Sequence, residues 1–194
     1  MVSDPIFSHL CYALGRLPQV LEYAERAAVL DPCNSICYIY IALSLNALDR
    51  LVEAEQAFRK ALELSPDAPG MRAGLALALE RLGRHDEALV EANCEPTDFV
   101  RWRTLGILHF RGGNLAESDR ALNALIERFG DDAGFNIAIN FAVRGDVDRA
   151  FEWLERGNTQ HDSGMAYVKC NWMLRPLQAD PRWPVFMKKM GFDE

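Results

Sequence analysis

Residues 48–66 read LDRLVEAEQAFRKALELSP, and two other stretches of the chain repeat this phrase. They are LGRLPQVLEYAERAAVLDP at residues 14–32 and LGRHDEALVEA at residues 82–92. When the three stretches are aligned, Gly15, Asp49 and Gly83 share one column, and each spacing is 34 residues. A constant period of this size is typical of solenoids of stacked helix pairs, in which one pair cannot bury its apolar face alone. The period therefore predicts an all-α fold.

The residues inside each phrase support helix pairs. Between Ala54 and Leu64, apolar residues recur every three or four positions, as one buried helical face requires. Glycine in the shared column provides a left-handed residue that closes a turn between two helices. The Ser65-Pro66 dipeptide then ends the pair, because proline cannot continue a helix.

The second repeat most clearly resembles the tetratricopeptide repeat (TPR). That family's pattern is an aromatic residue, Leu-Gly, Tyr, Ala, Phe, Ala and a closing Pro. Partial matches restart at Trp102 with Leu105-Gly106, and again at Ile137-Ala138. The resemblance implies an α-α superhelix of about five helix pairs. In the second repeat the slots hold Tyr38, Ile41-Ala42, Leu45, Ala54, Phe58, Ala61 and Pro66.

The resemblance covers roughly residues 1–157 and leaves a different C-terminal part. We expect the third repeat to have a short second helix, because Pro96 interrupts it early. After residue 157 the period stops, and we expect a polar loop over 158–164. A capping helix then runs to Met190, with Asp180 as N-cap and Pro181 at the first helical position. The expected repeats are 1–34, 35–68, 69–98, 99–130 and 131–157, and residues 158–194 form the loop and capping segment.

The tail also resembles the ending of TPR arrays in bacterial multidomain regulators. Those arrays often end in a DPR motif followed by MG, which Asp180-Pro181-Arg182 and Met190-Gly191 match. This resemblance implies the sensory or regulatory part of a larger signalling or transcription-regulator protein. A simpler interpretation is a solubilising cap over the open apolar end of the solenoid.

Charge and composition argue against several classes of partner. The net charge of −7 argues against nucleic acid and anionic membranes, which attract clusters of Lys and Arg. No apolar run reaches the ~20 residues that span a bilayer, and the start, MVSDPIF, lacks the features of a signal peptide. Five cysteines, an odd number, favour reduced thiols and a cytoplasmic protein.

The sequence contains no motif for catalysis, and we expect neither a cofactor nor a metal site. It lacks a phosphate-binding glycine loop, a nucleophile elbow and a metal-spaced His/Cys cluster. We interpret His85 as a turn residue, Asp86 as a helix-start residue and His161, next to Asp162, as a loop residue. A non-enzymatic interaction scaffold is therefore the first hypothesis, and an enzyme with a site assembled across repeats ranks last.

The family geometry implies where a protein or peptide partner binds. In TPR arrays the first helix of each pair lines a concave groove, and here the corresponding positions are mostly apolar. Such a groove favours a peptide or an amphipathic helix, with Arg103 and Arg111 orienting an acidic residue. Two alternatives stay open, self-association and packing of these residues against the chain's own C-terminal segment. The expected groove residues are His9, Tyr12, Ile39, Tyr40, Leu43, Leu77, Arg103, Ile107, Phe110, Arg111, Phe135 and Ile139.

Overall fold

The computed structural model describes residues 10–192, and this part of the chain contains helices and turns but no strand. The all-α prediction is confirmed. None of these helices has the length and apolar character needed to cross a bilayer. The helices are α2 (Leu17–Leu30), α3 (Ser35–Ala47), α4 (Leu51–Leu64), α5 (Met71–Arg81), α6 (His85–Asn93), α7 (Asp98–Arg111), α8 (Leu115–Phe129), α9 (Gly134–Val143), α10 (Val147–Thr159) and α11 (Arg182–Lys189), with the 3₁₀ helices η1 (Ser163–Tyr167) and η2 (Trp172–Leu177) before α11.

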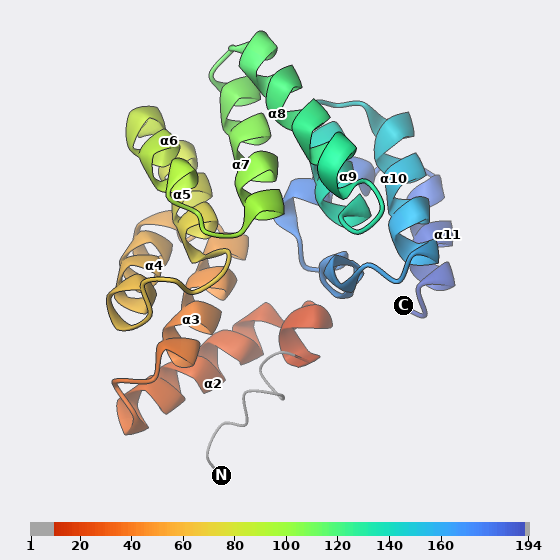
Figure 1. Cartoon of the computed structure of the whole chain (residues 1–194). Coiled ribbons are helices and arrows are strands. Elements are labelled where there is room, and N and C mark those ends of the chain that lie inside the picture. Colours follow the sequence, from red (N-terminus) through yellow and green to blue (C-terminus); the bar gives the residue numbers. More distant parts are fainter. Residues whose placement is uncertain (1–9, 193–194) are drawn as a thin grey trace.

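Consecutive helices form antiparallel pairs that follow one another along the array (Figure 1). The pairs are α3 with α4, α5 with α6, α7 with α8, and α9 with α10, while helical residues 10–13 precede α2. Glycines at the turns inside the pairs have positive φ angles, for example 79° at Gly83. The prediction of about five pairs is confirmed. Asp49 occupies the same turn position with φ 63°, a conformation that is uncommon for a residue with a side chain.

Small residues let the helices approach closely. Ala42, Ala54 and Ala76 are completely buried, and the Phe58 ring is buried between the second and third pairs. Gly74 on α5 faces this ring, and a Cβ atom there would lie 2.6 Å from Phe58 Cζ. Small residues that face large ones therefore build the core between successive helices.

The third pair is irregular, as expected. Helix α6 has 9 residues, compared with 14 in α4 and 15 in α8. Beyond its end, Glu95 is fully buried, which is unusual for a carboxylate. Its two carboxylate oxygens accept hydrogen bonds from the backbone amides of Gly70 (3.0 Å) and Ala73 (3.2 Å) at the start of α5. The early break thus brings an acidic side chain to a helix N-terminus, where it satisfies free N–H groups.

The C-terminal part is more ordered than the predicted loop. Helix α10 continues to Thr159, and η1 begins at Ser163, so the polar stretch 158–164 is mostly turns of helix. The physical reason is Asp162, whose carboxylate accepts hydrogen bonds from the amides of Gly164 and Phe135, both at 2.8 Å. The predicted capping helix is present as α11, but its predicted start is wrong by one residue: the helix begins at Arg182 with Pro181, not Asp180, as N-cap. Asp180 lies before it and accepts a hydrogen bond from the Arg182 amide at 2.9 Å. The Phe186 ring of α11 packs edge-on against Phe151 at a centroid distance of 6.4 Å.

The contact between Gly74 and Phe58 gives the first prediction. Gly74→Leu overpacks this contact and should lower the free energy of unfolding by ~1–3 kcal/mol, measured by urea denaturation. Phe58→Leu in the same chain makes room for the new side chain. The double variant should therefore lose less stability than the sum of the two single losses. Strictly additive losses would contradict the packing described here.

Candidate functional site

A pocket of about 540 Å³ lies between the first helices of the pairs and the C-terminal part of the chain. We call residues 163–177, which include η1 and η2, the crossing segment. The walls come from α3, α5, α7 and α9 on one side and from the crossing segment on the other. Of the expected groove residues, seven line this pocket: Tyr12, Ile39, Tyr40, Leu43, Leu77, Arg103 and Phe135.

Other expected groove residues lie elsewhere. Ile107 and Ile139 are 1% and 0% exposed, so the structure places them in the core and not on a binding wall. Phe110 packs beneath the Arg144 guanidinium, 5.6 Å from the ring centroid. Arg111 is exposed at the edge of the crossing segment. His9 lies outside the described residues.

The crossing segment covers part of the concave side of the array. Its 3₁₀ helix η2 packs against α9, and Leu174 and Leu177 are completely buried. The chain therefore occupies part of its own groove, which was one of the alternatives that the sequence left open. In Figure 1 the blue C-terminal part runs beside α9 before α11 returns to α10.

Polar contacts fix the far end of the crossing segment. Arg175 donates a hydrogen bond to Ala47 O (2.7 Å) and forms an ion pair with Asp49 (3.0 Å) at the turn between α3 and α4. Asp49 also pairs with Arg81 of α5. The Trp172 ring lies under the Arg81 guanidinium, at 4.2 Å from the ring centroid. This cluster joins the crossing segment to α3 and α5.

The cluster also sets the charge on Asp49. Burial acts to raise the pKa of this carboxyl, but hydrogen bonds from Arg81 and Arg175 outweigh it and leave the pKa below its usual value. Sequence analysis missed Asp49 as an anchor. The available signal was the shared turn column, where aspartate stands in the position that glycine holds in the neighbouring repeats.

Aromatic rings form the N-terminal end of the pocket. The Tyr12 ring lies 6.5 Å from Tyr40 and 5.9 Å from Tyr167, measured between centroids. Burial, together with the neighbouring Cys170 and Tyr167, raises the pKa of Tyr12 well above its usual value. Burial also raises the pKa of the Cys170 thiol to about 12, so this thiol is protonated and unreactive at neutral pH.

His85 and His161, the two histidines that stand beside an aspartate in the sequence, lie apart in the structure and have different surroundings. The Nδ1 atom of His85 lies 2.6 Å from the Glu80 carboxylate, so this residue contacts α5 instead of being fully solvated. His161 is exposed in a turn with φ 57°. Within residues 10–192, no group of three His, Cys, Asp or Glu side chains is arranged to hold a metal ion.

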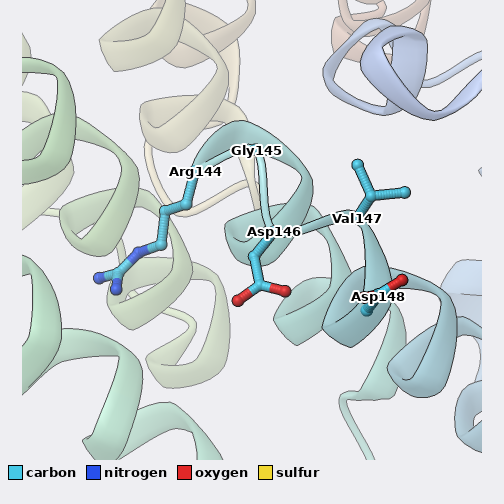
Figure 2. Close-up of a pocket in the computed structure, with 5 residues that line it drawn as sticks. All are labelled: Arg144, Gly145, Asp146, Val147 and Asp148. Carbon is cyan, nitrogen blue, oxygen red and sulfur yellow. The ribbon is translucent and has the colours of Figure 1, made fainter.

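Another hollow of about 470 Å³ lies at the turn between α9 and α10 (Figure 2). Its charged residues already have partners. Arg144 points away from the acidic residues of the hollow and pairs with Asp119 at 2.6 Å. Asp146 pairs with Arg149 at 2.6 Å, and Asp148 with Arg182 at 2.9 Å. Each charged side chain of this hollow is therefore already in an ion pair.

Comparison with known families agrees with the fold and the repeat pattern. The family model described as tetratricopeptide repeat matches residues 10–69, 41–93 and 103–163. The chain belongs to the tetratricopeptide repeat family. Repeats of this family serve as scaffolds for protein–protein interaction, and this array shares that architecture. A comparison with curated proteins finds no match.

Solved TPR structures resemble this array at low sequence identity. YrrB, described as a TPR protein with an unusual peptide-binding site, superposes with a TM-score of 0.52 and 20% identity, covering 84% of this chain and 87% of YrrB. The type IV pilus biogenesis factor PilW superposes with a TM-score of 0.54 and 19% identity, covering 92% of this chain and 88% of PilW. PilF of Pseudomonas aeruginosa superposes with a TM-score of 0.54 and 12% identity, covering 96% of this chain and 98% of PilF. These likenesses establish the fold.

The anchor at Asp49 gives the second prediction. Asp49→Asn removes the charge shared by Arg81 and Arg175 and should speed hydrogen exchange in residues 172–177 several-fold. Global stability should fall by only about 0–1 kcal/mol, because these ion pairs are partly exposed.

Asp148→Asn is the matched control, since it removes an exposed ion pair with Arg182 of α11 and not a contact of the crossing segment. This control should leave exchange in residues 172–177 unchanged. Equal exchange in wild type and Asp49→Asn would show that the apolar contacts alone hold the segment.

Proposed function

We propose that this TPR array is a non-enzymatic scaffold that binds a short protein segment in the pocket between its concave face and the crossing segment. The observation that carries this proposal is the shared wall. One cavity of about 540 Å³ gathers residues from α3, α5, α7, α9 and the crossing segment. A concave, mostly apolar cavity with a few polar groups is the usual form of a binding site.

The size of the pocket favours a short segment over a long amphipathic helix. A helix with its side chains is ~10–12 Å wide and rises 5.4 Å per turn, so one turn fills on the order of 500 Å³. The pocket therefore has room for about one helical turn or for a short extended stretch. A longer helix in the groove requires the crossing segment to leave.

The wall chemistry favours apolar anchors. Tyr12, Tyr40, Leu43 and Trp172 offer broad apolar surfaces, and such surfaces supply most of the affinity when a few side chains are anchored in a pocket. The TPR array of YrrB is described as having a peptide-binding site, which makes peptides the first class of ligand to test. The five free cysteines fit a reducing compartment, and we place the protein in the cytoplasm.

An alternative proposal is a regulatory role as part of a larger bacterial signalling protein. The supporting observation is the continuity of the pocket wall with the C-terminal helix. Trp172 and Met173 line the pocket, and the same chain leads directly into α11. A ligand in the pocket would contact Trp172 and Met173 and could shift the position of α11. This change at the end of the array could then be passed to another domain or partner.

A blocking substitution tests the proposed function. Peptides selected from a random library on the wild-type chain should bind at least tenfold more weakly to Leu43→Trp, because the indole fills the pocket. Fluorescence anisotropy of labelled peptides measures this loss. Val90→Trp is the control, since Val90 is 63% exposed on α6 and does not line the pocket.

The control should keep wild-type affinity, and circular dichroism should be the same for all three proteins. Selected peptides that bind Leu43→Trp as tightly as wild type would place the binding site elsewhere. A concentration-dependent dimer that Leu43→Trp disrupts, seen by analytical ultracentrifugation, would instead favour self-association.

A further inference from the structure

Arg103 is a partly buried cation that lacks an ion-pair partner among residues 10–192. Its Nη1 donates a hydrogen bond to Asn136 Oδ1 (3.1 Å), and its Nη2 lies 3.3 Å from Thr104 Oγ1. The Nε atom is buried and has no hydrogen-bond acceptor. Both acceptors are neutral, so the positive charge of this guanidinium is not compensated by a direct contact.

Two other arginines on first helices have carboxylate partners. Arg101, on the same helix, pairs with Asp98, and Arg72 of α5 pairs with Glu91 at 2.9 Å. Burying a charge without an opposite charge is costly, and folded proteins normally avoid it. Burial lowers the pKa of Arg103 to about 10, a shift that the charge of Glu95 opposes, so the side chain is still cationic at pH 7. A cation that lies on a pocket wall without a carboxylate in direct contact favours an anionic ligand.

Nearby carboxylates are already engaged. Glu95 accepts hydrogen bonds from backbone amides at the start of α5 and from the amide of Thr97. Asp162 does the same for Phe135 at the start of α9. The helix N-termini beside the pocket therefore carry acidic side chains of the chain itself. Arg103 is therefore the charged residue of the pocket lining that can pair with an anionic ligand.

The rest of the wall decides what kind of anion fits. Ile39, Tyr40, Leu43 and Leu77 line the same pocket as Arg103, together with Trp172 from the crossing segment. One guanidinium fork matches one carboxylate with two parallel hydrogen bonds. A doubly charged phosphate would bring a second charge into an apolar cavity without a partner. The ligand chemistry that matches is a single carboxylate on an apolar body.

We propose that the pocket selects an apolar carboxylate, with the carboxylate on Arg103 and the apolar body against the aromatic wall. This proposal rests on the pocket being the binding site proposed above. Two sources share the chemistry, the C-terminal residue of a peptide and a free monocarboxylic acid of similar size. Arg103 then provides specificity for the carboxylate, although burying its charge without a partner lowers the stability of the free chain.

Isothermal titration calorimetry with matched acid and amide probes tests the proposal. The peptide pair is N-acetyl-Leu-Phe with a free carboxylate and the same dipeptide as its C-terminal amide. The small-molecule pair is 3-phenylpropionic acid and 3-phenylpropionamide. We expect at least a tenfold preference for the acid in one pair, which also identifies the source. Arg103→Met should abolish the preference. Arg120→Met, which removes an exposed arginine of α8 that pairs with Glu117 and does not line the pocket, should keep it.

The outcomes separate this proposal from the proposed function. Equal affinity for acid and amide in both pairs overturns the carboxylate assignment and leaves peptide binding in the pocket standing. An acid preference that persists in Arg103→Met overturns it as well. Absence of binding by all four probes, with library peptides that still bind Leu43→Trp, overturns both proposals. If Arg103→Met does not fold, the acid–amide comparison on the unaltered chain decides.

Discussion

The pocket of this array depends on the contact between its crossing segment and the concave ends of the first helices. Without residues 163–177, the first helices would present an open groove, as expected for a bare solenoid. With them, the groove is divided, and one part becomes a cavity that has walls on both sides. The segment also buries apolar residues, for example Leu174 and Leu177, that would otherwise face solvent. A single structural element thus both covers the array and shapes the pocket.

Asp49 shows how a repeat position is adapted to this role. A left-handed conformation favours glycine at this turn, and a residue with a side chain accepts some backbone strain there. In return its carboxylate binds Arg81 and Arg175, which come from different parts of the chain. Partly exposed pairs contribute ~0–1 kcal/mol each, so strain and gain are of similar size. The position therefore fixes the path of the segment more than it adds stability.

Sequence reasoning predicts the parts of this structure that obey a local period. The turn glycines and the packing of Ala54, Phe58 and Ala76 repeat at fixed spacing, so the pairs and their core follow from the pattern. The crossing segment obeys no such period, because short 3₁₀ turns leave little periodic signal. Its anchor joins Arg175 to Asp49 across 126 residues, a pairing that one sequence does not encode visibly.

The same limit applies to the candidate site. Tyr12, Ile39, Leu43 and Leu77 share the pocket because they occupy equivalent faces of successive first helices. Ile139 belongs to the same predicted set, yet it is completely buried on α9, the helix against which η2 packs. The family geometry therefore identifies the face, while the path of the C-terminal chain decides which positions on that face are accessible.

The energetics of the crossing segment favour a ligand that binds beside it. Fully burying a Leu side chain contributes ~1.5–3 kcal/mol, so Leu174 and Leu177 together outweigh the ion pair of Arg175, worth at most ~1 kcal/mol. A short peptide gains little by displacing apolar surface that it must then replace. An occupant of the existing cavity keeps these contacts and adds its own against Trp172 and Met173. A ligand of the proposed kind would therefore tighten the segment against the array and leave the C-terminal end more ordered than in the free chain.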